Sequence, residues 1–96
     1  MNFAKRVQRG IKVLDQKYPD WRNSIVLDEL ELSHAKYCII GQVAYHRGYN
    51  YDEVMERLAG TDSDVIEFAY EHGFDSEFSD QYEKLQEEWV RALKDE

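Results

Sequence analysis

The residues with the greatest potential for chemistry gather in one stretch, SHAKYCIIGQVAYHRGYNY, at residues 33–51. It contains the only cysteine of the chain, Cys38, and His34 lies four residues before it. On a helix the two side chains would share a face. The histidine could then serve as a base for the thiol, or the pair could supply two ligands of a zinc site.

Both kinds of chemistry lack supporting residues. A zinc site needs four ligands, but His46 faces away from His34 on a helical wheel, and no CxxC, HxxxH or HExxH motif is present. A cysteine among Ile39, Ile40 and Val43 behaves as a small hydrophobic residue. We therefore expect no catalytic residues, no metal, no cofactor and no enzymatic activity, with Cys38 in the core.

The elements that position this stretch are predicted to be helices. Apolar residues recur every three or four positions over residues 3–18, until Pro19 ends the pattern. Ser33 is a candidate N-cap for a helix at about 34–47 whose apolar residues point to almost all sides, as expected of a central helix. Three further helices are predicted at about 51–59, 64–72 and 79–94. Their capping signals are Asn50 with Glu53, Gly60, the TDSD segment that ends at Asp64, and Gly73.

Residues 25–32, IVLDELEL, break the helical period, because Leu30 and Leu32 alternate with Glu29 and Glu31. This pattern predicts an extended segment that is either a connector or pairs with its own copy in a homodimer. The fold expected for residues 1–96 is one all-α domain. It is a small bundle of about five helices around a buried helix at about 34–47, with one extended segment at about 25–32.

Gly41 and Gln42 need an explanation within the central helix. A glycine there costs helix stability but lets another backbone come close. A long amide among apolar residues must find hydrogen-bond partners, and it could bind the backbone of the extended segment or line a small polar pocket. The pocket alternative comprises His34, Cys38, Gln42 and Tyr45, and it would hold a nucleotide or another small molecule.

Charge is distributed unevenly along the chain. The net charge is -8, yet residues 1–22 carry six basic residues against two acids. After residue 50 there are fifteen acids against four basic residues. Either the basic first helix folds onto the acidic remainder, or the acidic surface meets a basic partner. The basic residues of the predicted first helix are too few against the twenty acids of the chain to form a phosphate footprint, so we expect no direct binding of nucleic acid.

Exposed tyrosines next to acidic residues suggest where a partner would bind, because tyrosine is a frequent anchor of interfaces. The candidate partner-binding residues are Tyr49, Tyr51, Asp52, Glu53, Glu56, Asp62 and Asp64. No apolar run approaches the roughly 20 residues of a membrane span. A single cysteine suits a reducing compartment. We therefore expect a cytoplasmic protein that does not enter a membrane.

The order of the segments GIKVLDQKYPDWRNSIVLDELELS, CIIGQ, HGFD and YEKLQEEWVRAL resembles a family of short acidic proteins encoded by bacteriophages and their bacterial hosts. The match covers most of residues 10–93, and it is specific in order and spacing. His72 stands where tyrosine is commoner, and Ile39 and Ile40 replace a valine-leucine pair. The matched residues are Leu14, Asp15, Pro19, Trp21, Arg22, Leu30, Leu32, Ser33, Cys38, Gly41, Gln42, Gly73, Phe74, Asp75, Leu85 and Trp89.

This resemblance implies a phage or prophage accessory gene, and a host cell cytoplasm as the place of action. Together with the acidic surface, it leads us to expect a non-enzymatic protein of anti-defence type. Such a protein would bind and inhibit a host macromolecule, a host protein with a basic surface, by an acidic face that imitates nucleic acid. The alternative is the small-molecule or nucleotide-binding module with its pocket near Cys38, Gln42 and Tyr45.

Overall fold

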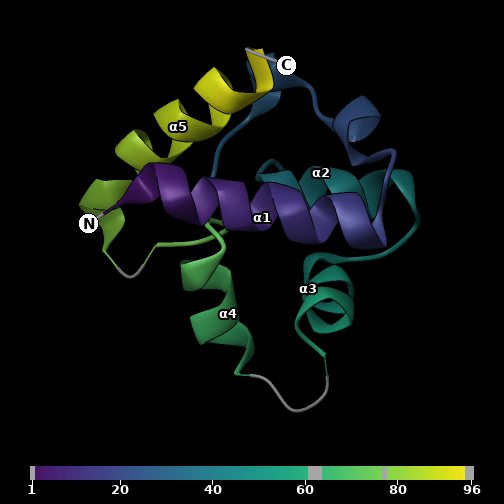
Figure 1. Ribbon diagram of the computed structural model, residues 1–96. Coiled ribbons are helices and arrows are strands. Elements are labelled where there is room, and N and C mark those ends of the chain that lie inside the picture. Colours follow the sequence, from purple (N-terminus) through teal and green to yellow (C-terminus); the bar gives the residue numbers. More distant parts are fainter. Residues whose placement is uncertain (1, 61–63, 77, 95–96) are drawn as a thin grey trace.

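The computed structural model describes residues 2–60, 64–76 and 78–94 of the chain. Within these ranges the protein is a bundle of five α-helices without a β-strand, so the predicted all-α architecture is confirmed (Figure 1). The helices are α1 (Phe3–Lys17), α2 (Ile39–His46), α3 (Tyr51–Ala59), α4 (Val65–Glu71) and α5 (Tyr82–Lys94). Short 3-10 helices occupy Trp21–Ser24, Leu27–Glu29 and Ser79–Gln81.

Helix α1 packs against α5, α3 and α4, and α2 packs against α3 and the turn at Trp21–Ser24. Figure 1 shows α1 crossing the molecule, with α5 on one side of it and α3 and α4 on the other. The apolar stripe of α1 enters the core through Val7, Ile11 and Leu14. In the core the Trp21 and Trp89 rings meet edge to face with centroids 6.1 Å apart, and Phe74 stacks on Trp89 at 5.8 Å.

Helix α2 is the central buried helix that the sequence predicts, because every residue from Ile39 to Ala44 is buried. Its predicted start at Ser33 is wrong. Residues 33–37 are exposed and form turns, and the N-cap is Cys38, whose Sγ accepts a hydrogen bond from Gly41 N at 3.3 Å. His34 therefore lies outside the helix. The prediction failed because a serine before apolar residues is compatible with a helix start, whereas tertiary contacts place the start five residues later.

Gly41 explains how that turn is accommodated. A Cβ on Gly41 would lie 2.0 Å from the carbonyl oxygen of Ala35, far inside van der Waals contact. The turn therefore rests directly on the helix, in the space that a side chain would occupy. The prediction that glycine here admits another backbone is confirmed.

Within residues 25–32 the backbone is extended at Ile25, Val26 and Leu30, Leu27–Glu29 form a 3-10 turn, and Leu32 begins the turns that precede α2. The predicted extended segment is therefore interrupted. Leu30 and Leu32 are buried, and Glu29 and Glu31 are exposed, as the alternation predicts. The backbone of this segment bonds to side chains of two helices. Gln86 of α5 accepts from Leu32 N at 3.0 Å and donates to Leu30 O at 2.8 Å, and Gln42 of α2 binds Val26. A dimer formed by pairing this segment with its copy would have to displace both glutamines.

The ends of α3 and α4 agree with the sequence signals, whereas the last helix, predicted from about residue 79, begins at Tyr82 after the 3-10 turn at Ser79–Gln81. Asn50 and Glu53 form a capping box at the start of α3, with Glu53 N donating to the Asn50 side chain at 2.9 Å and Asn50 N donating to Glu53 at 3.2 Å. Asp64 caps α4 through its carboxylate. Gly60 and Gly73 follow α3 and α4 with positive φ angles of 82° and 73°.

Candidate binding groove

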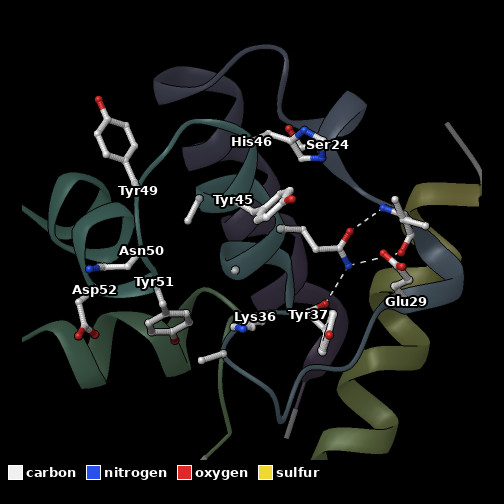
Figure 2. Close-up of a pocket in the computed structure, with 15 residues that line it drawn as sticks. Ser24, Glu29, Lys36, Tyr37, Tyr45, His46, Tyr49, Asn50, Tyr51 and Asp52 are labelled. Carbon is white, nitrogen blue, oxygen red and sulfur yellow. Dashed lines mark hydrogen bonds between the residues drawn. The ribbon is translucent and has the colours of Figure 1, made fainter.

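A groove of about 870 Å³ lies between the exposed side of α2, the start of α3 and the segments at residues 24–29 and 35–37 (Figure 2). We call it the tyrosine groove, because four of the seven tyrosines of the chain line it. Its lining residues are Ser24, Val26, Glu29, Ala35, Lys36, Tyr37, Gly41, Gln42, Ala44, Tyr45, His46, Tyr49, Asn50, Tyr51 and Asp52.

The four tyrosines differ in exposure. Tyr45 is 81% exposed, although it projects from the most buried helix, and Tyr37 is 42% exposed. Tyr49 is half-buried, and the Arg57 guanidinium lies over its ring at 4.2 Å. Tyr51 is also half-buried, and this burial raises the pKa of its hydroxyl. Tyr45 and Tyr37 thus offer free aromatic surface, whereas Tyr49 and Tyr51 pack on the protein.

Gln42 forms part of the groove floor, and the protein itself satisfies its amide. Its Oε1 accepts from Val26 N at 2.6 Å, and its Nε2 donates to Tyr37 O at 2.8 Å and to Val26 O at 3.4 Å. Of the two alternatives drawn from the sequence, the contact with the extended backbone is therefore the one found. The same bonds fix the groove wall at Val26 and Tyr37 relative to α2.

Cys38 and His34 do not line the groove. Cys38 is 1% exposed, and burial raises the pKa of its thiol to about 11, so little thiolate forms near neutral pH. His34 is exposed, its Nδ1 accepts from Lys36 N at 3.2 Å, and its ring lies 4.7 Å from that of Tyr37. Of the four residues predicted to form a pocket, Gln42 and Tyr45 line the tyrosine groove, and His34 and Cys38 do not.

The candidate partner-binding residues do not all lie together. Tyr49, Tyr51 and Asp52 line the groove, and Glu56 is exposed farther along α3. Glu53 and Asp64 are exposed at helix starts, where they cap α3 and α4. Asp62 lies outside the described residues. The groove therefore unites three of these residues with Tyr45, which the sequence assigned to the other site.

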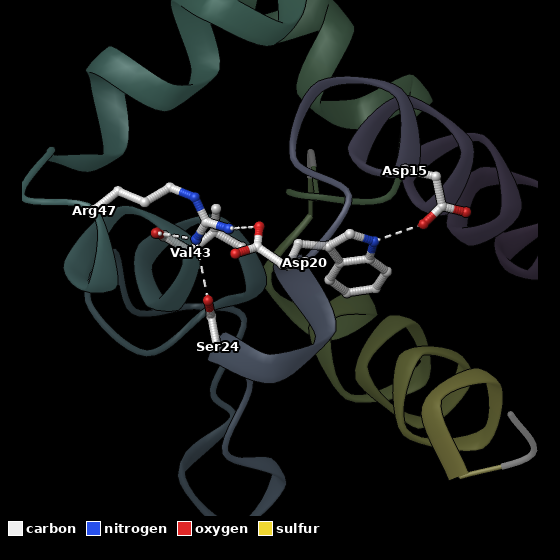
Figure 3. A network of polar contacts seen from close by, with 6 residues as sticks. Asp15, Asp20, Ser24, Val43 and Arg47 are labelled. Atoms are coloured by element: carbon white, nitrogen blue, oxygen red, sulfur yellow. Dashed lines mark hydrogen bonds and ion pairs between the residues drawn. The ribbon is translucent and has the colours of Figure 1, made fainter.

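Two polar residues that position the groove were missed by the sequence analysis. Arg47 donates to Val43 O and Ser24 Oγ, both at 3.0 Å, and to Asp20 at 2.6 Å (Figure 3). It also lies over the Tyr18 ring at 5.0 Å. The other residue is Gln86, described above. The only sequence signal for Arg47 is a cation directly after an apolar helix, where it can bind the last carbonyls.

Within the described ranges, no ion pair joins a lysine or arginine of α1 to an acidic residue beyond residue 50. The ion pairs among the described residues are Asp15–Arg22, Asp20–Arg47 and Glu88–Arg91, and none contains a lysine or arginine of α1. Hydrogen bonds from Arg22 and then from the Trp21 indole lower the pKa of Asp15. The basic residues Lys5, Arg9 and Lys12 are exposed.

In the described ranges, no helix is both long and apolar enough to cross a membrane, and no three acidic, histidine or cysteine side chains gather where they could hold a metal ion. Comparisons with protein-family models, with curated proteins and with solved structures find no match to this chain.

Proposed function

We propose that this protein is a non-enzymatic binding protein that docks a partner protein on the tyrosine groove. The observation that carries the proposal is Tyr45, which lines the groove and is 81% exposed (Figure 2). A large aromatic side chain with a polar tip is a frequent anchor in protein interfaces. Tyr37 and Val26, which are 42% and 46% exposed, extend the apolar surface beside it.

Hydrogen bonds hold the segments around Tyr45 in place. Gln42 joins the Val26 and Tyr37 backbones to α2, and Arg47 joins Ser24 to the end of the same helix. A binding surface that is already ordered loses less conformational entropy when a partner docks. The groove walls are therefore suited to recognition without rearrangement.

The setting of this proposal comes from the resemblance to short acidic phage proteins and from the net charge of -8. In that setting the partner is a host macromolecule, and the protein inhibits it by covering a functional surface. Asp52 lines the groove, and Glu53 and Glu56 are exposed on the same helix; these acids would face a basic surface of the partner.

The volume of the groove is within the usual range of ligand pockets, roughly 300 to 1,000 Å³. In the small-molecule alternative, the Gln42 amide is the polar group expected to bind the ligand. The Gln42 amide, which suggested such a site, is bonded to the backbone of Val26 and Tyr37. Docking of a protein on the exposed tyrosines therefore fits the groove better than a nucleotide pocket does.

The test places a photo-crosslinking amino acid, p-benzoyl-phenylalanine, at position 45 of the protein expressed in its host cells. The matched control carries it at position 66, because Ile66 is 64% exposed on α4 and does not line the groove. We expect one protein to be captured from position 45 and not from position 66. The purified partner should then bind Tyr45→Ala at least tenfold more weakly, and Ile66→Ala unchanged. Equal capture at both positions, or unchanged binding by Tyr45→Ala, would overturn the proposal.

A further inference from the structure

The tyrosine groove carries unpaired acidic groups on both sides of its exposed aromatic surface. Figure 2 shows Glu29 and Asp52 at opposite sides, with Tyr37 and Tyr45 between them. Both carboxylates are exposed, and neither forms an ion pair with another described residue. Lys36 is the one lysine or arginine in the lining, and Asp28 and Glu31 add exposed acids next to Glu29. The groove therefore favours a cationic ligand.

Cation–π contacts within the protein show how its aromatic rings bind cations. Three guanidinium groups lie over aromatic rings: Arg22 over Trp21 at 4.7 Å, Arg47 over Tyr18 at 5.0 Å and Arg57 over Tyr49 at 4.2 Å. Two of them, Arg22 and Arg47, also pair with a carboxylate, that of Asp15 and Asp20 respectively. An aromatic face and a carboxylate thus act together on one guanidinium, which can stack and donate in its plane at the same time.

The groove offers the same two groups without the guanidinium. Tyr45 presents a ring that is 81% exposed and meets the His46 ring edge to face with centroids 5.6 Å apart, and the carboxylates of Glu29 and Asp52 form no ion pair with another described residue. We propose that the segment of the partner that enters the groove carries arginine, with a guanidinium on the face of Tyr45 and basic charge directed at Glu29 and Asp52. This inference rests on the proposed function and adds the chemistry of the partner. Arginine is favoured over lysine, because a compact and strongly hydrated ammonium cannot stack in this way.

The test compares tetra-arginine and tetra-lysine peptides of equal charge, titrated into the ¹⁵N-labelled protein at low salt. We expect tetra-arginine to bind about threefold more tightly, because a guanidinium can stack on the ring and donate hydrogen bonds in its plane, whereas an ammonium acts as a point charge. The amide shifts should map to the groove, at residues 26, 29, 35–37, 45–46 and 51–52. Tyr45→Ala should abolish the preference for arginine, and the matched Ile66→Ala should retain it.

The carboxylates are tested with Glu29→Gln and Asp52→Asn, which should each weaken both peptides about twofold or more. Glu67→Gln is the matched control, because Glu67 is an exposed acid of α4 outside the groove. The dispersion of the amide spectrum checks that each variant is folded.

Equal affinity for the two peptides, or shifts outside the groove, would overturn the arginine proposal. If position 45 nevertheless crosslinks to a partner, the proposed function stands and only the chemistry of the partner is wrong. If the peptides discriminate but position 45 captures no protein, the docking function is wrong.

Discussion

The side-chain amide of Gln42 pairs with the backbone of Val26 as a neighbouring strand would, accepting from its N–H at 2.6 Å and approaching its carbonyl oxygen at 3.4 Å. The same Nε2 group donates to Tyr37 O at 2.8 Å. One side chain therefore joins α2 to the extended segment on one side and to the turn before the helix on the other. Because Val26 and Tyr37 form walls of the tyrosine groove, this amide holds the binding surface in shape.

Gln42→Glu should test that role with almost no change in size. Near neutral pH the carboxylate keeps an acceptor for Val26 N but faces the carbonyl oxygens of Val26 and Tyr37 without a proton to donate. We expect a loss of about 3 kcal/mol in the free energy of unfolding, measured by urea denaturation. Acidification that protonates the carboxyl should reduce the loss. Gln8→Glu on the exposed side of α1 is the control, with a change under about 0.5 kcal/mol. A loss that does not depend on pH would contradict the missing donor as its cause.

Gln42 and Gln86 bind the same extended segment at different places, so their contributions should be coupled. Gln86 holds Leu30 and Leu32, and Gln42 holds Val26. If the loss of one glutamine lets the segment detach from the helices, the remaining glutamine contributes less to the free energy of unfolding. The double variant Gln42→Glu/Gln86→Glu should then lose less stability than the two single variants together, by about 0.5 kcal/mol or more in a double-mutant cycle. Strict additivity would show that the anchors act independently.

The sequence predicted the helical architecture because each helix has an apolar stripe and local end signals. Asn50, Glu53, Asp64 and Gly73 act within a few residues of their own position, so no tertiary information was needed to interpret them. The start of α2 could not be predicted in this way. It depends on the contact between Gly41 and the carbonyl of Ala35, and residues 33–37 carry no signal against a helix.

The groove was predicted only in part, for a similar reason. Gly41 and Gln42 could be recognised as positions that require a partner, and Tyr49 and Tyr51 as candidate contact residues. The opposite wall, at Ser24, Val26 and Glu29, comes from a segment whose position depends on Gln42, Gln86 and Arg47. A single polar residue on an amphipathic helix usually indicates the solvent face, so Gln86 gave no signal.

Gly41→Ala should destabilise the protein, although alanine normally favours a helix over glycine by roughly 0.5 to 1 kcal/mol. The new Cβ would lie 2.0 Å from Ala35 O, so the turn at residues 33–37 would have to move. We expect a loss of about 2 to 3 kcal/mol in the free energy of unfolding. Gln16→Ala, on the exposed side of α1, should be neutral or slightly stabilising. Equal behaviour of the two variants would show that the close approach at Gly41 has no energetic role.

Cys38 should be unreactive in the folded protein. It is 1% exposed, and its Sγ already caps α2 by accepting from Gly41 N. Burial raises the pKa of the thiol to about 11, so neither access nor thiolate is available to a reagent at about pH 8. We expect Ellman's reagent to modify Cys38 at least about a hundredfold more slowly in the native protein than in guanidinium chloride, since modification requires opening. Rapid native reaction would contradict the packing role.

The buried thiol also predicts a loss of stability in alkaline solution. The pKa of Cys38 rises from its ordinary value of 9.0 to about 11 in the folded protein. Between these values the native state holds a proton that the unfolded state has released, so the free energy of unfolding falls as the pH rises. Below about pH 9 the contribution is fully present. By about pH 10.5, ionisation of this thiol alone should lower the free energy of unfolding by about 2 kcal/mol.

Cys38→Ser isolates this contribution, because a serine hydroxyl can still accept from Gly41 N but does not ionise in this range. The half-buried Tyr51 and Tyr82 also have raised pKa values, Tyr82 to about 12 through burial and its hydrogen bond to Asp75, and they remain in both proteins. The stability of the wild type relative to Cys38→Ser, measured by urea denaturation from about pH 7 to 10.5, should therefore fall by about 2 kcal/mol. A constant difference would mean that the thiol does not titrate between the two states, and that tyrosines alone account for any alkaline loss.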